Sequence, residues 1–332
     1  MTEATGFPRL VGDVGGTHAR FATVSGAGCP LQAMALYRCD RFASVGDALQ
    51  HYLSEHGLAP PQSCALGVAT PVSGDHVQLT NHHWSFSIRE LQQLLGVQRL
   101  LVLNDFLALA LSLPALQASD LRQVGGGEAI AGAPIALIGP GTGLGVSGLL
   151  PLPAGKGHVP IGGEGGHVTL SSFDPEEAAV LDWLHQVWGH ASAERALSGA
   201  GLENLYLALS ALGGQARPPL AAPQITERAL LADDQLCVKA LTMFCGLLGS
   251  VAGNLALTLG ARGGVYIGGG IVPRLGTWFD RSPFRERFEN KGRFRDYLRA
   301  IPTWTLITEV SPALIGASRA LDCRVFSDSS VH

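Results

Sequence analysis

Positive charge is scarce in this 332-residue sequence, because 27 Asp and Glu residues outnumber 23 Lys and Arg residues and give a formal net charge of −4. Proteins that bind nucleic acids or anionic membranes usually concentrate Lys and Arg on one face. The composition therefore predicts no nucleic-acid partner and no membrane surface as partner. Small neutral or anionic ligands remain as candidates.

Closely spaced cysteine pairs are also missing. The six cysteines are scattered, with no CxxC spacing and no dense framework. Such a set is typical of ordinary buried thiols in a reducing compartment. The opening segment, MTEATGFPRL, has neither the basic start nor the apolar run of a secretory signal peptide. We therefore expect a cytoplasmic protein.

No apolar run reaches the length that a bilayer helix needs. In the nearest candidate, residues 236–259, Lys239 and Asn254 leave only 14 residues between them. A spanning helix requires about 18 to 20. This segment predicts a buried helix instead.

Two common phosphate-binding motifs can be excluded. Lys156 and Lys291 are each followed by glycine, so no GxxxxGK[ST] loop exists. A GxGxxG does occur at Gly143, Gly145 and Gly148, but the residues LLPLP follow it where a dinucleotide-binding fold begins a helix. In a chain with 43 glycines, about one such match is expected by chance.

Apolar runs rich in strand formers alternate with helical patterns along the chain, which predicts α/β architecture, and the length favours two domains. We expect a helix from Asp174-Pro175-Glu176-Glu177 to Gly189, another from Asn104 to Pro114, and a crossing between domains at 123–134. Strands are expected at residues 10–14, 21–24, 65–69, 100–103, 135–138, 265–267 and 305–307, the last before a terminal helix.

One pattern occurs twice. The stretches LVGDVGGTHARFATV (10–24) and ALIGPGTGLGVSGLL (136–150) share a plan of strand, glycine turn containing Thr, and second strand. Glycine turns let backbone N–H groups approach an oxyanion, because no Cβ stands in the way. The repetition predicts two similar domains that face each other across a cleft.

These stretches carry a resemblance to a known family. GDVGGT (12–17), GPGTG (139–143) and YIGGGIVPR (266–274) resemble the phosphate-1, phosphate-2 and adenosine segments of the sugar kinase, hsp70 and actin superfamily. A narrower resemblance to bacterial ATP-dependent glucokinases, of the group without the CxCGxxGC zinc motif, runs from about residue 10 to 321. It rests on TPVSGDHVQLTNHHWSFS (70–87), LNDFLALA (103–110), GGEGGHV (162–168), ERALSGAGLENLY (194–206) and FENKGRF (288–294). One departure is His18, where the family has Asn.

The resemblance implies an α/β fold of two actin-like (ribonuclease H-like) ATPase domains flanking a hinge cleft. The smaller domain would cover 8–118 plus 308–325, and the larger 119–307. The implied protein is a cytoplasmic homodimer with ATP and Mg²⁺ as cofactors. It would transfer the γ-phosphoryl group of MgATP to the 6-hydroxyl of glucose, giving glucose 6-phosphate and ADP, the first step of glucose use in glycolysis.

The resemblance places MgATP on the glycine turns. Thr17 and the backbone amides of the first turn would hold the phosphates, and Asp13 would orient Mg²⁺ through water, since Mg²⁺ keeps several of its waters. From local sequence alone, Asp13 could instead only cap the turn. The implied nucleotide-binding residues are Gly12, Asp13, Val14, Gly15, Gly16, Thr17, Gly141, Thr142, Gly268, Gly269 and Gly270.

Asp105 is the candidate catalytic base, because the attacking sugar hydroxyl must lose its proton to a positioned acceptor. Its local sequence has a second interpretation, since Asn104 or Asp105 would also suit a helix N-cap. The resemblance favours the base. It places six residues on glucose: Asn104, Asp105, Gly143, Glu164, His167 and Glu194.

Three of the sugar residues have alternatives in the local sequence. The spacing of Glu164 and His167 also suits metal ligands, although no third ligand is evident. Glu194 could lie in the first turn of a helix capped by Ser192 and oppose its dipole. The family pattern favours sugar binding for all three.

Some residues nearby are weaker candidates. An aromatic such as Trp84, beside His82 and His83, is more often a core residue than a stacking platform, and Asn81 could support the sugar loop. The segment 281–299 has seven Lys and Arg against three Asp and Glu, which predicts a solvated amphipathic helix face.

Two other function classes compete. A nonenzymatic sugar-sensing regulator usually has a DNA-binding module, and no extension of about 60 residues precedes Leu10 here. An actin-like filament protein would keep the nucleotide turns without needing the sugar residues.

Overall fold

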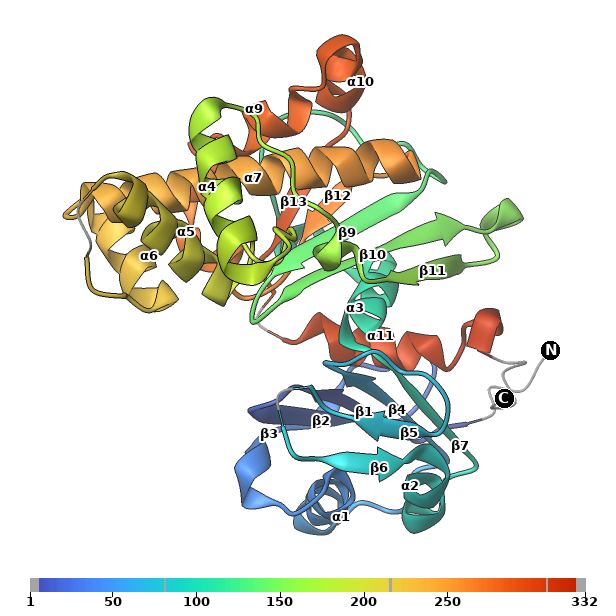
Figure 1. Cartoon of the computed structure of the whole chain (residues 1–332). Coiled ribbons are helices and arrows are strands. Elements are labelled where there is room, and N and C mark those ends of the chain that lie inside the picture. Colours follow the sequence, from blue (N-terminus) through green and yellow to red (C-terminus); the bar gives the residue numbers. More distant parts are fainter. Residues whose placement is uncertain (1–5, 81, 215–216, 309, 327–332) are drawn as a thin grey trace. The chain divides into compact units, whose positions relative to one another are not determined.

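The computed structural model describes residues 6–80, 82–214, 217–308 and 310–326, and the chain divides into two compact units (Figure 1). Unit 1 comprises Met1–Gln117, Leu152–Gly162 and Thr308–His332, and unit 2 comprises Ala118–Pro151 and Gly163–Ile307. Unit 1 thus includes Leu152–Gly162, a segment assigned to the larger domain in the sequence-based division. This segment carries most of strand β11 (His158–Gly163).

Unit 1 is built on a five-stranded sheet in the order β3-β2-β1-β4-β7. β1 pairs antiparallel with β2 and parallel with β4, and β4 pairs parallel with β7. A short antiparallel pair, β5 and β6, accompanies the sheet. The strands are β1 (Arg9–Val14), β2 (His18–Val24), β3 (Gln32–Arg38), β4 (Ser63–Val68), β5 (His76–Gln78), β6 (Ser85–Ser87) and β7 (Arg99–Asn104).

Helices cover both faces of this sheet. Figure 1 shows α1 (Val45–Glu55) and α2 (Ile88–Leu95) on one side, with α3 (Asp105–Ser112) and α11 (Pro312–Ala320) on the other. Strand alternation explains the two cores: Leu10 packs with the residues of α1 and α2, and Val11 packs with α11. Because both faces are covered, nearly every residue of the central strands β1 and β4 is buried, and most of these residues are apolar or glycine.

α11 packs very closely on α3. A Cβ at Gly316 of α11 would collide with the carbonyl oxygen of Ala108 in α3, and Arg319 Nε donates a hydrogen bond to Leu111 O at 2.9 Å. The C-terminal helix therefore supports the helix that begins with Asp105.

Unit 2 repeats the plan of unit 1. The strands of unit 2 lie side by side in the order β10-β9-β12-β13-β8. β9 and β10 are antiparallel, whereas β9, β12 and β13 are parallel. Its elements are β8 (Leu121–Gln123), β9 (Ile135–Pro140), β10 (Leu144–Pro151), β12 (Val265–Ile267), β13 (Thr303–Leu306), α4 (Pro175–Trp188), α5 (Gly199–Leu212), α6 (Ala222–Leu231), α7 (Gln235–Leu259), α8 (Thr277–Asp280), α9 (Phe284–Glu289) and α10 (Arg295–Arg299).

The predicted elements are confirmed. Both repeated stretches form antiparallel hairpins, and the largest shift of a predicted strand end is three residues, at the start of β2. α4 begins after Asp174, whose Oδ1 accepts a hydrogen bond from Glu177 N at 2.8 Å, and ends at Gly189 in the left-handed region.

α7 alone among the described helices has the length and apolar composition of a membrane span, and 67% of its most apolar window is buried inside the protein. It lies among the other helices of unit 2 (Figure 1). The expected buried helix at 236–259 is therefore confirmed.

The glycine-rich segment 123–134 does not cross between the units. The chain passes from unit 1 to unit 2 between Gln117 and Ala118, and the segment is tied to unit 2 by Val124 N to Thr303 O at 2.9 Å and Glu128 N to Ala300 O at 3.2 Å. These backbone bonds join residues far apart in sequence, which composition alone does not reveal.

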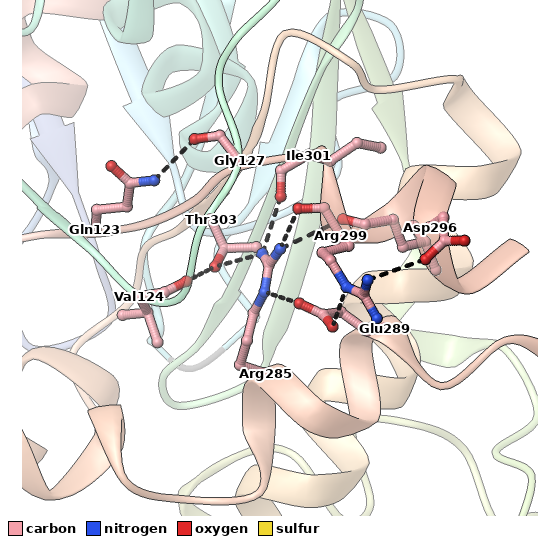
Figure 2. Close-up of polar contacts among 10 residues, drawn as sticks. Gln123, Val124, Gly127, Arg285, Glu289, Asp296, Arg299, Ile301 and Thr303 are labelled. Carbon is pink, nitrogen blue, oxygen red and sulfur yellow. Dashed lines mark hydrogen bonds and ion pairs between the residues drawn. The ribbon is translucent and has the colours of Figure 1, made fainter.

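The prediction of a solvated helix face over 281–299 holds only in part, because Arg281, Arg293, Arg295 and Arg299 are exposed but no continuous helix forms. Short helices replace it, and Arg285 turns inward to donate to Glu289 Oε1 at 2.7 Å and to the carbonyls of Ile301 and Arg299 at 2.9 Å each (Figure 2). Burial lowers the pKa of this guanidinium. The carboxylate and the carbonyls satisfy the buried cation, so a basic segment serves the interior.

Arg287 is the second basic residue of this segment that is buried. Its guanidinium forms a two-nitrogen ion pair with the Glu177 carboxylate, and its Nη2 also donates to Ser250 Oγ at 2.9 Å. The side chains of Arg287 and Glu177 are only 10% and 3% exposed. Removing either partner would leave a buried charge, so the pair locks α4, α7 and α9 together.

Candidate active site

The first glycine turn joins β1 to β2, and Cys39 forms hydrogen bonds to it. Gly15 N donates to His18 O at 3.0 Å, Cys39 N donates to Thr17 O at 2.9 Å, and the Cys39 thiol contacts Gly15 O at 3.4 Å. Cys39 is fully buried. It thus fixes two carbonyls of the turn from inside unit 1.

Asp13 lies on β1, close to this turn. Its Oδ2 accepts a hydrogen bond from Ser311 Oγ at 2.7 Å and lies 3.4 Å from Arg20 Nη1. The carboxylate is 17% exposed. Its described hydrogen bonds thus go to side chains rather than to the amides of the turn, which disfavours the turn-capping interpretation.

Asn104 and Asp105 stand where β7 passes into α3. Asn104 is the N-cap, since its Oδ1 accepts hydrogen bonds from Phe106 N at 3.0 Å and Leu107 N at 3.3 Å. Its Nδ2 donates to Thr70 O at 3.4 Å. The cap interpretation is therefore correct for Asn104.

Asp105 is the first residue of α3, and its Oδ1 accepts a hydrogen bond from Phe106 N at 2.8 Å. A carboxylate at a helix N-terminus is stabilised in its anionic form by the aligned peptide dipoles. Asp105 therefore lies at the carboxyl end of a parallel strand and at the start of a helix.

In unit 2, the second turn and the third glycine segment lie against each other. Gly141 N donates to Gly143 O at 2.8 Å, closing the turn beside Thr142, and Gly268 N donates to Ile138 O at 2.8 Å. A Cβ at Gly269 would collide with Pro140 O, and its φ of +76° is left-handed. The fold itself thus requires glycine at this position.

Other glycines of the predicted nucleotide set are not required by the fold. At Gly15 an added Cβ would meet only His18 O at 3.5 Å, at Gly141 only Gly270 N at 4.0 Å, and at Gly270 nothing within 4 Å. None of the three has φ in the left-handed region. A ligand that approaches the backbone closely would supply the missing reason for these glycines.

Glu194 and Gly143 are in direct contact within unit 2. Glu194 Oε2 accepts a hydrogen bond from Leu144 N at 2.8 Å, and a Cβ at Gly143 would collide with that oxygen. Glu194 N donates to Gly166 O at 2.8 Å, which joins it to the GGEGGHV segment. Glu194 lies in a turn, because α5 begins only at Gly199, so the helix-dipole interpretation was wrong.

Glu164 and His167 flank a short turn in the same unit. Their side chains are 61% and 59% exposed, with His167 Nε2 3.9 Å from Glu164 Oε2. Within the described ranges, no group of three His, Cys, Asp or Glu residues is placed to hold a metal ion. The metal interpretation of this pair therefore has no support.

Of the weaker candidates, Trp84 belongs to the core, whereas His82 is half-buried and His83 is exposed. Trp84 is 1% exposed and donates from Nε1 to Phe42 O at 3.1 Å, and His82 Nδ1 accepts from Trp84 N at 3.3 Å. Asn81 lies outside the described residues. Trp84 is thus a core residue, as the local sequence favoured.

The candidate residues form one group in each unit. Unit 1 holds Gly12 to Thr17 with Asn104 and Asp105, and unit 2 holds the remainder. The sequence missed Ser311 and Cys39, which contact the first turn from distant segments. The contact between Arg20 and Asp13 could have been predicted from sequence, because the pairing of the first hairpin places these two residues opposite each other.

Known proteins with similar sequences and structures were compared with this chain. A family model described as Glucokinase matches residues 10–323. The chain is 57% identical over 319 residues to a protein named glucokinase from Aromatoleum aromaticum, covering 95% of each chain, and 49% identical over 316 residues to one from Neisseria gonorrhoeae, again covering 95% of each. A crystal structure of glucokinase from an Antarctic psychrotroph superposes with a TM-score of 0.86 at 36% identity, covering 95% of this chain and 98% of the other.

Proposed function

The chain belongs to the glucokinase family of actin-like sugar kinases, and we propose that it transfers the γ-phosphoryl group of MgATP to the 6-hydroxyl of glucose, releasing glucose 6-phosphate and ADP. One observation carries the proposal. In a chain so similar to proteins of that name, Asp105 opens α3 directly after a parallel strand, with Asn104 as the cap that fixes the local backbone.

Asp105 acts as the catalytic base. As the 6-hydroxyl oxygen attacks the γ-phosphorus, the carboxylate accepts the hydroxyl proton, a contribution of about 10²–10⁴-fold. The cap bonds of Asn104 support this role because they hold the first turn of α3 in place. The backbone that carries Asp105 is thus held in place before glucose arrives.

The sugar hydroxyls bind to a fixed set of donors and acceptors. Asn104 offers Nδ2, Glu164 and Glu194 offer carboxylate oxygens, and His167 offers a ring nitrogen, with Gly143 contributing backbone. The contact of Glu194 with Leu144 N supports the proposal because it holds one sugar ligand rigidly. A site of this kind rejects sugars that lack a matching hydroxyl, since its own polar groups would be left unpaired.

MgATP lies along the glycine segments. The three glycines that neither φ nor neighbours require support close contact with phosphate oxygens at Gly15, Gly141 and Gly270. Asp13 is a hard oxygen donor of the kind that Mg²⁺ prefers, and it would hold the metal through a bound water. When bound, Mg²⁺ neutralises phosphate charge and orients the phosphates.

The domains 8–118 with 308–325 and 119–307 would close about a hinge over both substrates. Closure excludes water and so limits the loss of ATP to hydrolysis. Six free cysteines support a cytoplasmic location. A homodimer in solution, which light scattering after size exclusion would detect, completes the proposal.

Glucose-dependent release of ADP is the decisive test. The purified full chain should release ADP from MgATP only when glucose is present. A sugar-sensing regulator would bind glucose without turnover, and a filament protein would release ADP without glucose. Either of these results would overturn the proposal.

Replacing Asp105 with Ala tests the base. We expect turnover to fall about 10²-fold or more while calorimetry still detects glucose binding, because the proton acceptor is lost but the other sugar-binding residues remain. Asp47→Ala is the matched control, since Asp47 also lies in the first turn of a unit 1 helix. Near-normal turnover of Asp105→Ala would remove Asp105 from its role.

A further inference from the structure

Ser311 occupies the N-cap position of α11 but does not cap that helix. A serine there usually accepts a hydrogen bond from the backbone N–H two or three residues later. Ser44 does so at α1, accepting from Asp47 N at 3.1 Å. For α11 no side-chain cap bond is formed, and the Ser311 hydroxyl donates to Asp13 Oδ2 instead.

This bond joins residues 298 positions apart, between the first strand and the last long helix of unit 1. At 2.7 Å from a charged acceptor, it belongs to the strong class of hydrogen bonds. The other described partner, Arg20, is 3.4 Å away with a side chain 46% exposed. Exposed ion pairs hold geometry weakly, so Ser311 is the main constraint on the carboxylate.

Both partners bind the same oxygen. With Oδ2 held by Ser311 and Arg20, the Asp13 carboxylate cannot rotate freely about its Cβ–Cγ bond. A local rule is thus broken at a serine whose hydroxyl contacts the carboxylate of a proposed ligand residue, which is where departures from local preference are expected.

We propose that Ser311 is a positioning residue for metal and nucleotide binding. By holding Oδ2, it keeps Oδ1 of Asp13 available to accept a hydrogen bond from a water of the Mg²⁺ that accompanies ATP. The inference rests on the proposed function, because it acts through Asp13. Ser311 itself touches neither substrate nor metal.

The first experiment measures the gain in nucleotide affinity that Mg²⁺ provides. A nonhydrolysable ATP analogue is titrated calorimetrically into the full chain with and without MgCl₂, and the ratio of the two affinities is compared between variants. We expect Ser311→Ala to reduce this ratio about tenfold and Ser311→Thr, which keeps the hydroxyl, to restore most of it. An unchanged ratio in Ser311→Ala would overturn the inference.

Ser44→Ala is the matched control. Ser44 Oγ also donates to an aspartate, Asp47 Oδ2 at 2.8 Å, from the N-cap of a unit 1 helix. It should lower the thermal midpoint through its lost cap while leaving the Mg²⁺ ratio unchanged. If Ser311→Ala does not fold, Ser311→Val against Ser311→Thr makes the same comparison at nearly constant shape.

A double-mutant cycle separates action through Asp13 from a structural effect. In an Asp13→Asn background, Ser311→Ala should change the affinity for MgATP by less than twofold, because the residue it positions is already altered. Additive losses would overturn the positioning role. Failure of the proposed function is distinct, since it would show as wild-type protein without glucose-dependent ADP release.

Discussion

The two glycine hairpins differ at the second cross-strand pair from the turn. In β1–β2 this pair is Asp13 opposite Arg20, and in β9–β10 it is Gly139 opposite Gly145. Each hairpin is antiparallel, and its first strand pairs in parallel with another strand of its own unit. The same hairpin therefore presents two charged side chains at this pair in unit 1 and two glycines without side chains in unit 2.

The difference shows how a repeated scaffold can serve two purposes. A carboxylate suits a hard metal ion, whereas bare backbone suits close contact with an extended ligand. Unit 1 fixes its carboxylate with the distant Ser311, and unit 2 fixes its turn by packing Gly269 against Pro140. Electrostatics therefore distinguishes the first turn, and close packing the second.

Removing the charge should have the largest effect. We expect Asp13→Asn to lower kcat/KM for MgATP about 10²-fold or more, because the metal loses an anionic partner, while KM for glucose changes little. Steady-state kinetics with each substrate varied would measure this. Asp47→Asn, a carboxylate of unit 1 away from the turn, should leave both constants unchanged, and equal losses in both variants would contradict the assignment.

Packing in unit 2 is tested by Gly269→Ala. The left-handed φ and the collision with Pro140 O should together lower the unfolding free energy by about 2 to 4 kcal/mol. Denaturant titration would measure the loss. Gly28→Ala, at a φ of +75° with no atom within 4 Å of the added Cβ, isolates the backbone contribution and should cost only about 1 kcal/mol. Equal losses would show that packing is not the cause.

Gly15→Ala should act through the ligand alone. Since neither φ nor close neighbours oppose a Cβ there, the unfolding free energy should stay within about 0.5 kcal/mol of wild type while affinity for the ATP analogue falls about tenfold. Gly126→Ala, where the added Cβ also meets nothing within 4 Å, should change neither quantity. A loss of stability without a loss of affinity would reassign Gly15 to the scaffold.

The smallest expected effect is on the pH dependence of the unfolding free energy, through His158 in unit 1. Burial lowers the pKa of His158, with a further contribution from Arg319. The unfolded chain therefore takes up this proton at a higher pH than the folded chain, so stability present above about pH 6.5 is lost as the pH falls below it. His158→Gln should reduce the decline in unfolding free energy between pH 7.5 and 5.5, and an unchanged slope would exclude His158 as its source.

Local sequence was sufficient for the strands beside the glycine turns and for the helices with clear end signals. Apolar runs on either side of a glycine turn indicated both hairpins, and Asp174 with Gly189 indicated the two ends of α4, because these signals involve neighbours within a few residues. The same signals located the Asn104-Asp105 pair between a strand and a helix. They did not separate the roles of these two residues.

Tertiary structure decided the rest, because it depends on partners far along the chain. It made Asn104 the cap, removed Glu194 from any helix, buried Arg285 and Arg287, and brought Ser311 to Asp13 across 298 residues. It also separated the glycines that the fold requires from those that it does not require. Composition and spacing do not reveal these contacts, since a contact between segments far apart in sequence leaves no local pattern.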